Sequence, residues 1–195
     1  MDINKPLYLI VHHTGGSNAD PLNDSSNFTF KQCDAQHKVS FNFKSTLGYY
    51  VGYHYYIEKD GKLYQARADT EEGAHTIGYN LHSIGICLAG NFDATLPTEA
   101  QKKTLQKLLL DKSVQWGISI QNVLPHRKFA TKTCFGRKLP DDWAQDLMRQ
   151  APIKNPAAAL QLFKELTEAM NLKDYKKAKD KTSYLFGELS KLTQI

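Results

Sequence analysis

Short apolar runs alternate with polar, glycine-containing segments along this chain, and the lengths of the runs predict both strands and helices. LYLIVHH at 7–13 and SIGICLAG at 83–90 are almost continuously apolar, which is typical of strands buried on both faces of a sheet. VGYHYYIEKDGKLYQAR at 51–67 has two runs of aromatic and β-branched residues around Asp60-Gly61 and predicts a hairpin. A type I′ turn is expected there because it needs positive φ, which glycine and aspartate tolerate best.

Helical signals lie between and after these strands. The segment at 30–41 predicts a short helix. Thr98 and Gln101 have the spacing of a capping box, and apolar residues at helical spacing follow them. A short strand is expected near Val123, and residues 139–150 predict a closing helix. Because strands alternate with helices but a hairpin is also present, we expect an α/β fold with a mixed central β-sheet flanked by helices.

The chain changes character after Gln150, where the sequence APIKNP is typical of a linker. Asn155 and Pro156 then have the order of an N-cap and a first helical residue, and a second, lysine-rich helical segment follows. We therefore expect a first domain at 1–150 and a helical hairpin at 151–195. Such a hairpin is too small to be stable alone, so it is expected to pack on the first domain, to dimerise or to contact an anionic surface.

The 195 residues carry a formal net charge of +5, and the sequence pI is about 9.0. This balance suits an anionic partner such as a cell-wall polymer, a membrane surface or a nucleic acid. No aromatic-basic recognition motif is present, so nucleic-acid binding is not expected. No run approaches the roughly 20 apolar residues of a membrane helix, and the N-terminus lacks the pattern of a secretory signal. We therefore expect a protein without a transmembrane segment that is cytoplasmic at synthesis.

The three cysteines are Cys33, Cys87 and Cys134. They are odd in number and widely spaced, which does not fit a disulfide framework and favours a reducing compartment at synthesis. Cys87 lies inside an apolar run, so we expect it to be a small buried hydrophobe.

The chemistry of the chain concentrates in LPHRKFATKTCFGRKL at 124–139, a basic segment without an acidic residue. His126 and Cys134 stand there with seven residues between them, and the first strand ends in His12-His13. Two imidazoles and one thiolate form the ligand set of an open catalytic zinc site. Successive side chains on a strand face opposite sides, so we assign His12 to the site and His13 to the other face or to a supporting role. On its own, the pair His126 and Cys134 also suits a surface histidine and a buried structural thiol.

Several other polar residues have both a structural and a functional interpretation. Tyr53 can pack in its strand or donate a hydrogen bond to an oxyanion, whereas His54 is expected to face away from it. His75 lies in a glycine-containing loop before a predicted central strand, where clefts form, although a loop histidine is commonly exposed. Asn80 is a turn-former in the simpler interpretation, and His37 is expected to be structural or solvated.

Four blocks of the chain together resemble one enzyme superfamily. IVHHT, VGYHYYIEKDGKLYQAR, GAHTIGYNLHSIGICLAGNF and PHRKFATKTC occur in the order and spacing of the zinc-dependent N-acetylmuramoyl-L-alanine amidases, which include phage endolysins and the peptidoglycan recognition proteins. The resemblance covers about residues 7–145 and leaves 151–195 unmatched. It implies a zinc ion held by His12, His126 and Cys134, and hydrolysis of the amide between N-acetylmuramic acid and L-alanine in peptidoglycan.

The resemblance also implies roles for residues around the metal. Tyr53 takes the position of the family's catalytic tyrosine, and Lys132 that of a catalytic lysine in the phage enzymes. His75 is similar to a substrate-groove histidine, and Asn80 is expected to bind substrate with it. Recognition proteins that lack the cysteine ligand bind without cleaving, so the presence of Cys134 favours an enzyme.

Peptidoglycan or muropeptides are the partners that this resemblance implies. A phage or prophage endolysin is expected to wait in the cytoplasm and to act on the cell wall after release. The alternatives are a cytosolic amidase that recycles muropeptides and a non-catalytic module that binds peptidoglycan. Substrate size separates the two enzymes, whereas zinc content and release of stem peptide separate both from the binding module.

Overall fold

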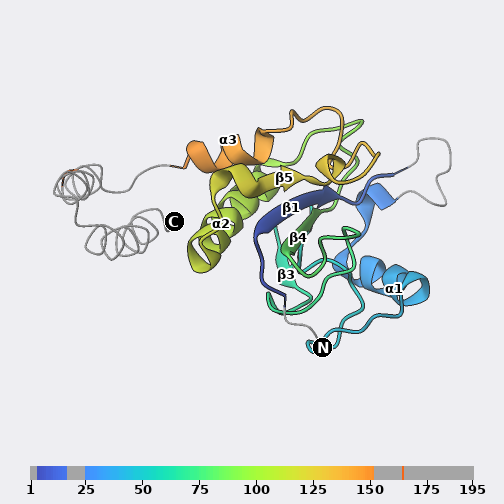
Figure 1. Cartoon of the computed structure of the whole chain (residues 1–195). Coiled ribbons are helices and arrows are strands. Elements are labelled where there is room, and N and C mark those ends of the chain that lie inside the picture. Colours follow the sequence, from blue (N-terminus) through green and yellow to red (C-terminus); the bar gives the residue numbers. More distant parts are fainter. Residues whose placement is uncertain (1–3, 17–24, 152–163, 165–195) are drawn as a thin grey trace. The chain divides into compact units, whose positions relative to one another are not determined.

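Five strands form one sheet at the centre of the computed structural model, which describes residues 4–16, 25–151 and 164 (Figure 1). The strands are β1 (Tyr8–His13), β2 (Tyr55–Ile57), β3 (Leu63–Gln65), β4 (Ser83–Leu88) and β5 (Val123–Pro125). Their order in the sheet is β3-β2-β4-β1-β5. β2, β4, β1 and β5 run parallel to one another, and β3 pairs antiparallel with β2. The expected mixed sheet is therefore confirmed.

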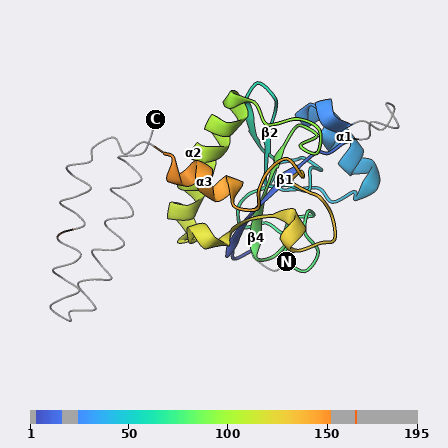
Figure 2. The same ribbon diagram turned by 90° about the horizontal axis from the view of Figure 1, so that it is seen from above.

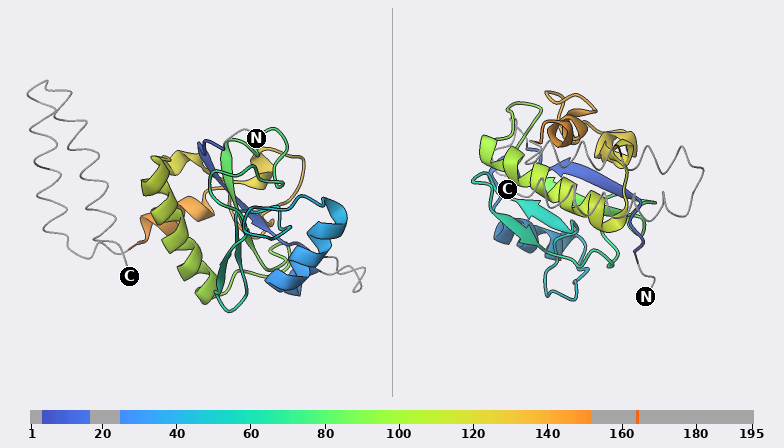
Figure 3. Two further views of the ribbon diagram at one scale, coloured as in Figure 1. Left: turned by 90° about the horizontal axis from the view of Figure 1, so that it is seen from below. Right: turned by 90° about the vertical axis from the view of Figure 1, so that its left-hand side faces the viewer.

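Helices cover both faces of this sheet (Figure 2). α2 (Glu99–Trp116) and α3 (Trp143–Arg149) lie on one face, and α1 (Phe30–Ser40) lies on the other, as the view from below also shows (Figure 3). The side chains of β1 alternate accordingly. Leu9 and Val11 join the core on the side of α2, so the intervening Ile10 and the following His12 face the side of α1.

Two apolar cores hold these layers together. The larger core lies between the sheet and the α2–α3 layer and includes Ile86, Leu105 and Leu109, none of which is exposed. The smaller core lies under α1 and includes Cys33 and Cys87. Cys87 is 0% exposed and packs among apolar neighbours, as its place in an apolar run predicts.

Side-chain caps fix the starts of the two longer helices, and a glycine ends α2. Thr98 and Gln101 form the predicted capping box, in which each side chain accepts a hydrogen bond from the other residue's backbone N–H. Gly117 ends α2 in the left-handed conformation, with φ of 64°, where glycine has no steric penalty. Thr29 and Gln32 form a second capping box at the start of α1.

The hairpin between β2 and β3 forms, but the predicted type I′ turn at Asp60-Gly61 is wrong. The N–H of Gly61 donates to the carbonyl of Glu58, and the N–H of Glu58 donates to the carbonyl of Lys62. Gly61 has a φ of 85°. Asp60 does not have positive φ, because Asn42 is the one non-glycine residue with positive φ in the described part of the chain. This longer loop therefore needs a left-handed residue only at Gly61. Asp60 instead accepts a hydrogen bond from the N–H of Lys62 through its carboxylate.

The closing helix is shorter than the sequence predicts, because α3 begins at Trp143 and not at Leu139. Pro140 disfavours the helical conformation of the residue before it, so a helix cannot easily start at Leu139. The N–H of Trp143 donates to the carbonyl of Pro140 at 3.1 Å and closes a turn there. Leu139 is buried in the larger core all the same.

None of the helices in the described ranges is long and apolar enough to cross a membrane. The described residues up to Arg149 make up one compact unit. The helical hairpin expected at 151–195 lies outside the described residues, apart from Ala151 and Lys164. Its boundary and its role therefore stay predictions.

Candidate active site

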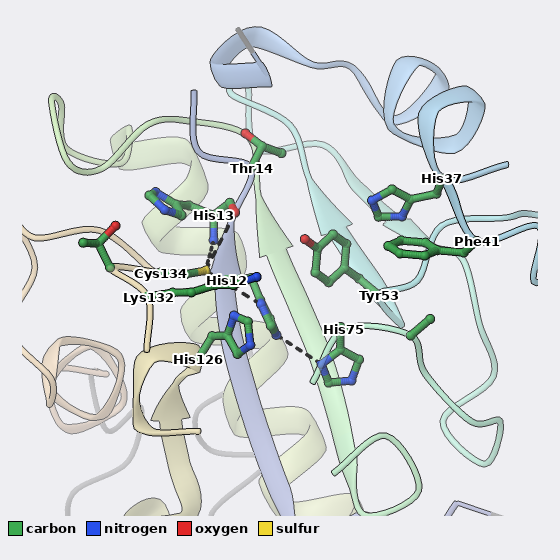
Figure 4. Close-up of a pocket in the computed structure, with 12 residues that line it drawn as sticks. His12, His13, Thr14, His37, Phe41, Tyr53, His75, His126, Lys132 and Cys134 are labelled. Atoms are coloured by element: carbon green, nitrogen blue, oxygen red, sulfur yellow. Dashed lines mark hydrogen bonds between the residues drawn. The ribbon is translucent and has the colours of Figure 1, made fainter. Parts of the chain in front are cut away.

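Three potential metal ligands that are far apart in the sequence meet at one end of the sheet (Figure 4). His12 lies near the end of β1, His126 begins the short 3-10 helix η4 (His126–Lys128) directly after β5, and Cys134 lies in the next loop. Their donor atoms all lie within 4.8 Å of one another. Cys134 Sγ is 3.8 Å from His12 Nδ1, and the ring centroids of His12 and His126 are 4.4 Å apart.

The register of the sheet explains this meeting. β1 and β5 are parallel neighbours that pair up to the residues just before His12 and His126. Because parallel strands end at the same edge of a sheet, both histidines emerge there side by side. The backbone N–H of His13 then donates to Cys134 Sγ at 3.4 Å, which ties the loop to the end of β1.

The three side chains fit a zinc ion. Zinc bonds of about 2.0–2.1 Å to nitrogen and 2.3 Å to sulfur, at a tetrahedral angle, put two such donor atoms about 3.5 Å apart. The 3.8 Å between Cys134 Sγ and His12 Nδ1 is close to that separation. Three protein ligands also leave a fourth position for water or substrate, which distinguishes a catalytic zinc site from a closed structural one.

Burial controls the protonation of these side chains. It lowers the pKa of His12 well below its ordinary value, and the neighbouring His75 and His126 lower it further. Burial also lowers the pKa of His126, so both imidazoles are neutral and have a lone pair to offer at neutral pH. Burial raises the pKa of the Cys134 thiol to about 12, although Lys132 acts in the opposite direction. A bound cation would convert this thiol into a thiolate.

The three residues line a pocket of about 520 Å³. Figure 4 shows Lys132 beside Cys134, and Tyr53 across from them on the other side of His12. The remaining lining residues come from the end of β1, from the region of α1, from the loop before β4 and from the loop of Cys134: His13, Thr14, His37, Phe41, Ala74, His75 and Thr133.

Tyr53 and Lys132 lie where they can reach a substrate in this pocket. The ring of Tyr53 is 5.0 Å from that of His12, between centroids. Burial raises the pKa of the Tyr53 phenol well above its ordinary value, and the neighbouring Cys87 raises it further. The phenol therefore keeps its proton and is a hydrogen-bond donor. Lys132 lies on an exposed part of its loop.

Helix α1 holds the backbone that leads to Tyr53. Asp34 accepts hydrogen bonds from the N–H groups of Tyr50 and Val51, at 2.6 and 3.1 Å. His37 Nδ1 accepts a hydrogen bond from the N–H of Gly52 at 2.9 Å. The sequence predicts His37 to be structural or solvated, and it is structural but also lines the pocket. The spacing of three between Asp34 and His37, which places both on one helix face, is the signal that sequence reasoning missed.

His13 and His54 use their rings in structural hydrogen bonds. His13 Nδ1 accepts the N–H of Phe92 at 3.0 Å, on the opposite side of β1 from His12. His54 is 0% exposed; its Nδ1 accepts the N–H of Gly85, and its Nε2 donates to the carbonyl of Glu71. Neither ring is therefore grouped with the three potential metal ligands.

The loop that carries His75 and Asn80 lies next to His12. His75 Nδ1 is 3.1 Å from His12 Nε2, so His75 contacts a potential ligand as well as lining the pocket. The side-chain oxygen of Asn80 accepts the backbone N–H groups of His75 and Thr76, at 3.0 and 2.8 Å. Asn80 therefore shapes the loop and does not line the pocket, and its contact with substrate stays a prediction.

A family model described as N-acetylmuramoyl-L-alanine amidase matches residues 2–138. The chain belongs to this amidase family. The matched residues run from β1 to the loop of Cys134 and include all three potential ligands. The family predicted from the four sequence blocks is therefore confirmed.

Known proteins of this kind align with most of the described unit. The human N-acetylmuramoyl-L-alanine amidase is 32% identical over 149 residues, which are 74% of this chain and 24% of the human protein. The endolysin of Klebsiella phage KP32 is 34% identical over 101 residues, which are 49% of this chain and 66% of the endolysin. The solved structure of the amidase LysC from Clostridium intestinale covers 75% of this chain and 87% of LysC, with 25% identity and a TM-score of 0.61. This chain spans about a quarter of the length of its mammalian relatives.

Proposed function

We propose that this amidase-family chain is a zinc-dependent hydrolase that cleaves the amide between N-acetylmuramic acid and L-alanine in peptidoglycan. The observation that carries the proposal is the meeting of His12, His126 and Cys134, with all donor atoms within 4.8 Å, at the wall of a pocket. A zinc ion held there would supply an activated water and polarise the scissile carbonyl.

The surrounding residues have separate tasks in this proposal. His12 and His126 would hold the ion through neutral imidazoles, and Cys134 through its thiolate. The N–H of His13 donates to the same sulfur and fixes its position. One negative ligand lowers the net charge of the centre, so additional stabilisation of the developing oxyanion becomes more important.

Lys132 and Tyr53 are the residues that we assign to the oxyanion. Lys132 brings a cation from the exposed loop, and Tyr53 brings a buried O–H that keeps its proton. Both line the pocket that contains the ligands. Figure 4 shows them on different sides of His12, so a substrate amide bound between them would contact both.

The experiment that tests this function is mass spectrometry of purified peptidoglycan incubated with the full chain, with and without a zinc chelator. We expect free stem peptides that begin with L-alanine, and we expect the chelator to stop their release and added zinc to restore it. A protein that contains zinc in a one-to-one ratio, binds muropeptide and releases no peptide would be a binding module instead.

We further propose that the natural substrate is the intact cell wall, as for an endolysin that is synthesised in the cytoplasm and released. The similarity to the phage endolysin supports this setting. Rates on intact walls and on small anhydro-muropeptides distinguish it from a recycling amidase, which would prefer the small substrate.

The segment 151–195 is proposed as a separate helical unit that either packs on the amidase domain or draws it to an anionic surface. Its lysine-rich sequence supports the second role. Deletion of 151–195 separates them: loss of solubility indicates packing, whereas weaker wall binding with intact muropeptide turnover indicates targeting.

A further inference from the structure

The imidazole of His75 lies against the metal ligand His12 on the side that faces away from Cys134. His12 Nδ1 is the ring nitrogen near Cys134 Sγ, at 3.8 Å, whereas His12 Nε2 is 3.1 Å from His75 Nδ1. The two rings are nearly perpendicular, at 86°, with 5.1 Å between their centroids (Figure 4). One nitrogen of His12 therefore faces the ligand cluster, and the other faces His75.

The space around the His75 ring is built to hold it in this position. A Cβ atom added at Gly73 or at Gly85 would lie 2.5 Å from the ring of His75, so only glycine leaves room for it. The backbone N–H of His75 is held by the side chain of Asn80 at 3.0 Å. Backbone on two sides and a fixed loop leave the ring little freedom to turn.

Only one of the two ring nitrogens of His75 has a polar partner among the described residues. Its second ring nitrogen, Nε2, is buried and has no hydrogen-bond partner among the described residues. An unpaired buried polar atom costs free energy, so another interaction must outweigh its burial. The polar contacts of the ring are made by Nδ1, which lies 3.1 Å from His12 Nε2 and 2.9 Å from the Thr76 hydroxyl.

Proton counting assigns the direction of that contact. A neutral imidazole has one N–H, and His12 can offer a lone pair from Nδ1 only when its proton is on Nε2. This N–H then points to His75 Nδ1 as its acceptor, which places the proton of His75 on Nε2. The hydroxyl of Thr76 lies 2.9 Å from His75 Nδ1, so its O–H can donate to the same lone pair, whereas at 3.5 Å from His12 Nε2 it is only a weak acceptor for the His12 N–H.

We infer that His75 is a positioning residue for zinc: it accepts the Nε2 proton of His12 and thereby fixes both the tautomer and the orientation of that ligand. The inference rests on the proposed zinc function. It differs from the substrate-groove role that the sequence resemblance implies, because the nitrogen that approaches His12 is not available to a substrate. Hydrogen-bond partners of metal-bound histidines typically contribute 10–100-fold in metal affinity.

The test measures the affinity of the full-length protein for zinc by competition with a chromophoric chelator. His75→Ala removes the acceptor and is expected to weaken zinc binding by about 10–100-fold. His75→Asn keeps an acceptor oxygen near the position of Nδ1 and is expected to stay within a few-fold of the unmodified protein. His82→Ala, which removes an exposed histidine of the same region, is the matched control and should not change zinc affinity.

Melting temperatures of the zinc-free variants show whether each one folds. If His75→Ala unfolds, the comparison of His75→Asn with the unmodified protein decides, and a 10-fold or greater loss in His75→Asn overturns the inference. Unchanged zinc affinity in His75→Ala together with a raised KM for muropeptide also overturns it and returns His75 to the substrate groove. An unmodified protein that binds no zinc would instead overturn the proposed function, so the two failures remain distinct.

Discussion

At the scale of single residues, substitution of Lys132 can distinguish a loss of activity from a loss of stability. It lines the pocket beside Cys134 but lies on an exposed part of the loop. An exposed side chain contributes little to stability, so a change in activity on its removal can be ascribed to the reaction.

Lys132→Ala is expected to lower the turnover number by about 10²–10³-fold, because one charge-stabilising donor for the oxyanion is lost. Zinc content and peptidoglycan binding should remain unchanged. Release of stem peptide and metal analysis measure these quantities. Lys138→Ala, which removes a second exposed lysine of the same loop, should retain full turnover. Equal turnover in Lys132→Ala would remove this residue from the mechanism.

His54 makes folding depend on pH. Burial lowers its pKa from 6.5 in the unfolded chain to about 4 in the folded protein, so folding favours the neutral ring. Its contribution is fully present above pH 6.5 and is lost as the pH falls from there through about 4. Below pH 4 the free energy of unfolding is therefore lower by roughly 3 kcal/mol than above pH 6.5, at about 1.4 kcal/mol per unit of pKa.

Urea unfolding of the zinc-free protein at pH 7 and at pH 4.5 checks this contribution. The free energy of unfolding should fall between the two values, and it should fall less in His54→Gln, which lacks the titrating ring. The difference between the two proteins isolates His54 from the carboxylates that titrate in the same range. An identical loss in both proteins would exclude this residue as a source.

Residue chemistry explains which parts of the site could be predicted from the sequence. His12, His126 and Cys134 lie in blocks that resemble the amidases, so the resemblance predicts them as ligands, and the structure brings their donor atoms together. The partners of His37 and His75 depend on which segments pack against them. Nothing local in the sequence shows that Gly85, in strand β4, leaves room for the ring of His75.

At the scale of secondary-structure elements, α1 acts as a support for the pocket. Asp34 and His37 accept the N–H groups of three successive residues, 50–52, and so fix the backbone just before Tyr53. The ring of His37 also contacts that of Tyr53, at 5.5 Å between centroids. The position of Tyr53, the proposed hydrogen-bond donor, therefore depends on α1.

Asp34→Ala leaves two of these N–H groups without an acceptor and is expected to reduce the free energy of unfolding by about 1–3 kcal/mol. Turnover should also fall at a temperature at which the variant is fully folded, because Tyr53 is no longer held. Urea unfolding and stem-peptide release measure the two effects. Gln36→Ala, on the exposed side of the same helix, is the matched control. Loss of stability with full turnover would show that α1 does not position Tyr53.

Elements were predicted well where periodicity extends over several residues, and poorly where one contact decides. The apolar runs of β1 and β4 and the capping box of α2 indicate these elements directly. The turn type at Asp60-Gly61 and the start of α3 depend instead on individual hydrogen bonds and on Pro140. Sequence patterns do not specify such local choices.

At the scale of the whole described unit, the proposed zinc ion would join β1 to the loop after β5. A direct contact between those two segments is the bond from the His13 N–H to Cys134 Sγ. A ligand that binds only the folded state raises stability by mass action, by about 2.7 kcal/mol at a free concentration 100 times Kd.

Removal of zinc with a chelator is therefore expected to lower the melting temperature of the protein by several degrees, as about 1 kcal/mol shifts a domain of this size by roughly 2–4 °C or more. Added zinc should reverse the change. Cys134→Ser is expected to melt at the same temperature with and without chelator. A chelator effect of equal size in both proteins would contradict the assignment of Cys134 as a ligand.

The separation of His12 from Cys134 by 122 positions has a consequence for synthesis on the ribosome. Translation at about 5–20 residues per second puts on the order of 10 s between the appearance of the first of these side chains and the last. A nascent chain that has not yet reached Cys134 lacks one of the three proposed zinc ligands. Hydrolytic capacity would therefore arise late in translation, when nearly all of the catalytic unit has been made.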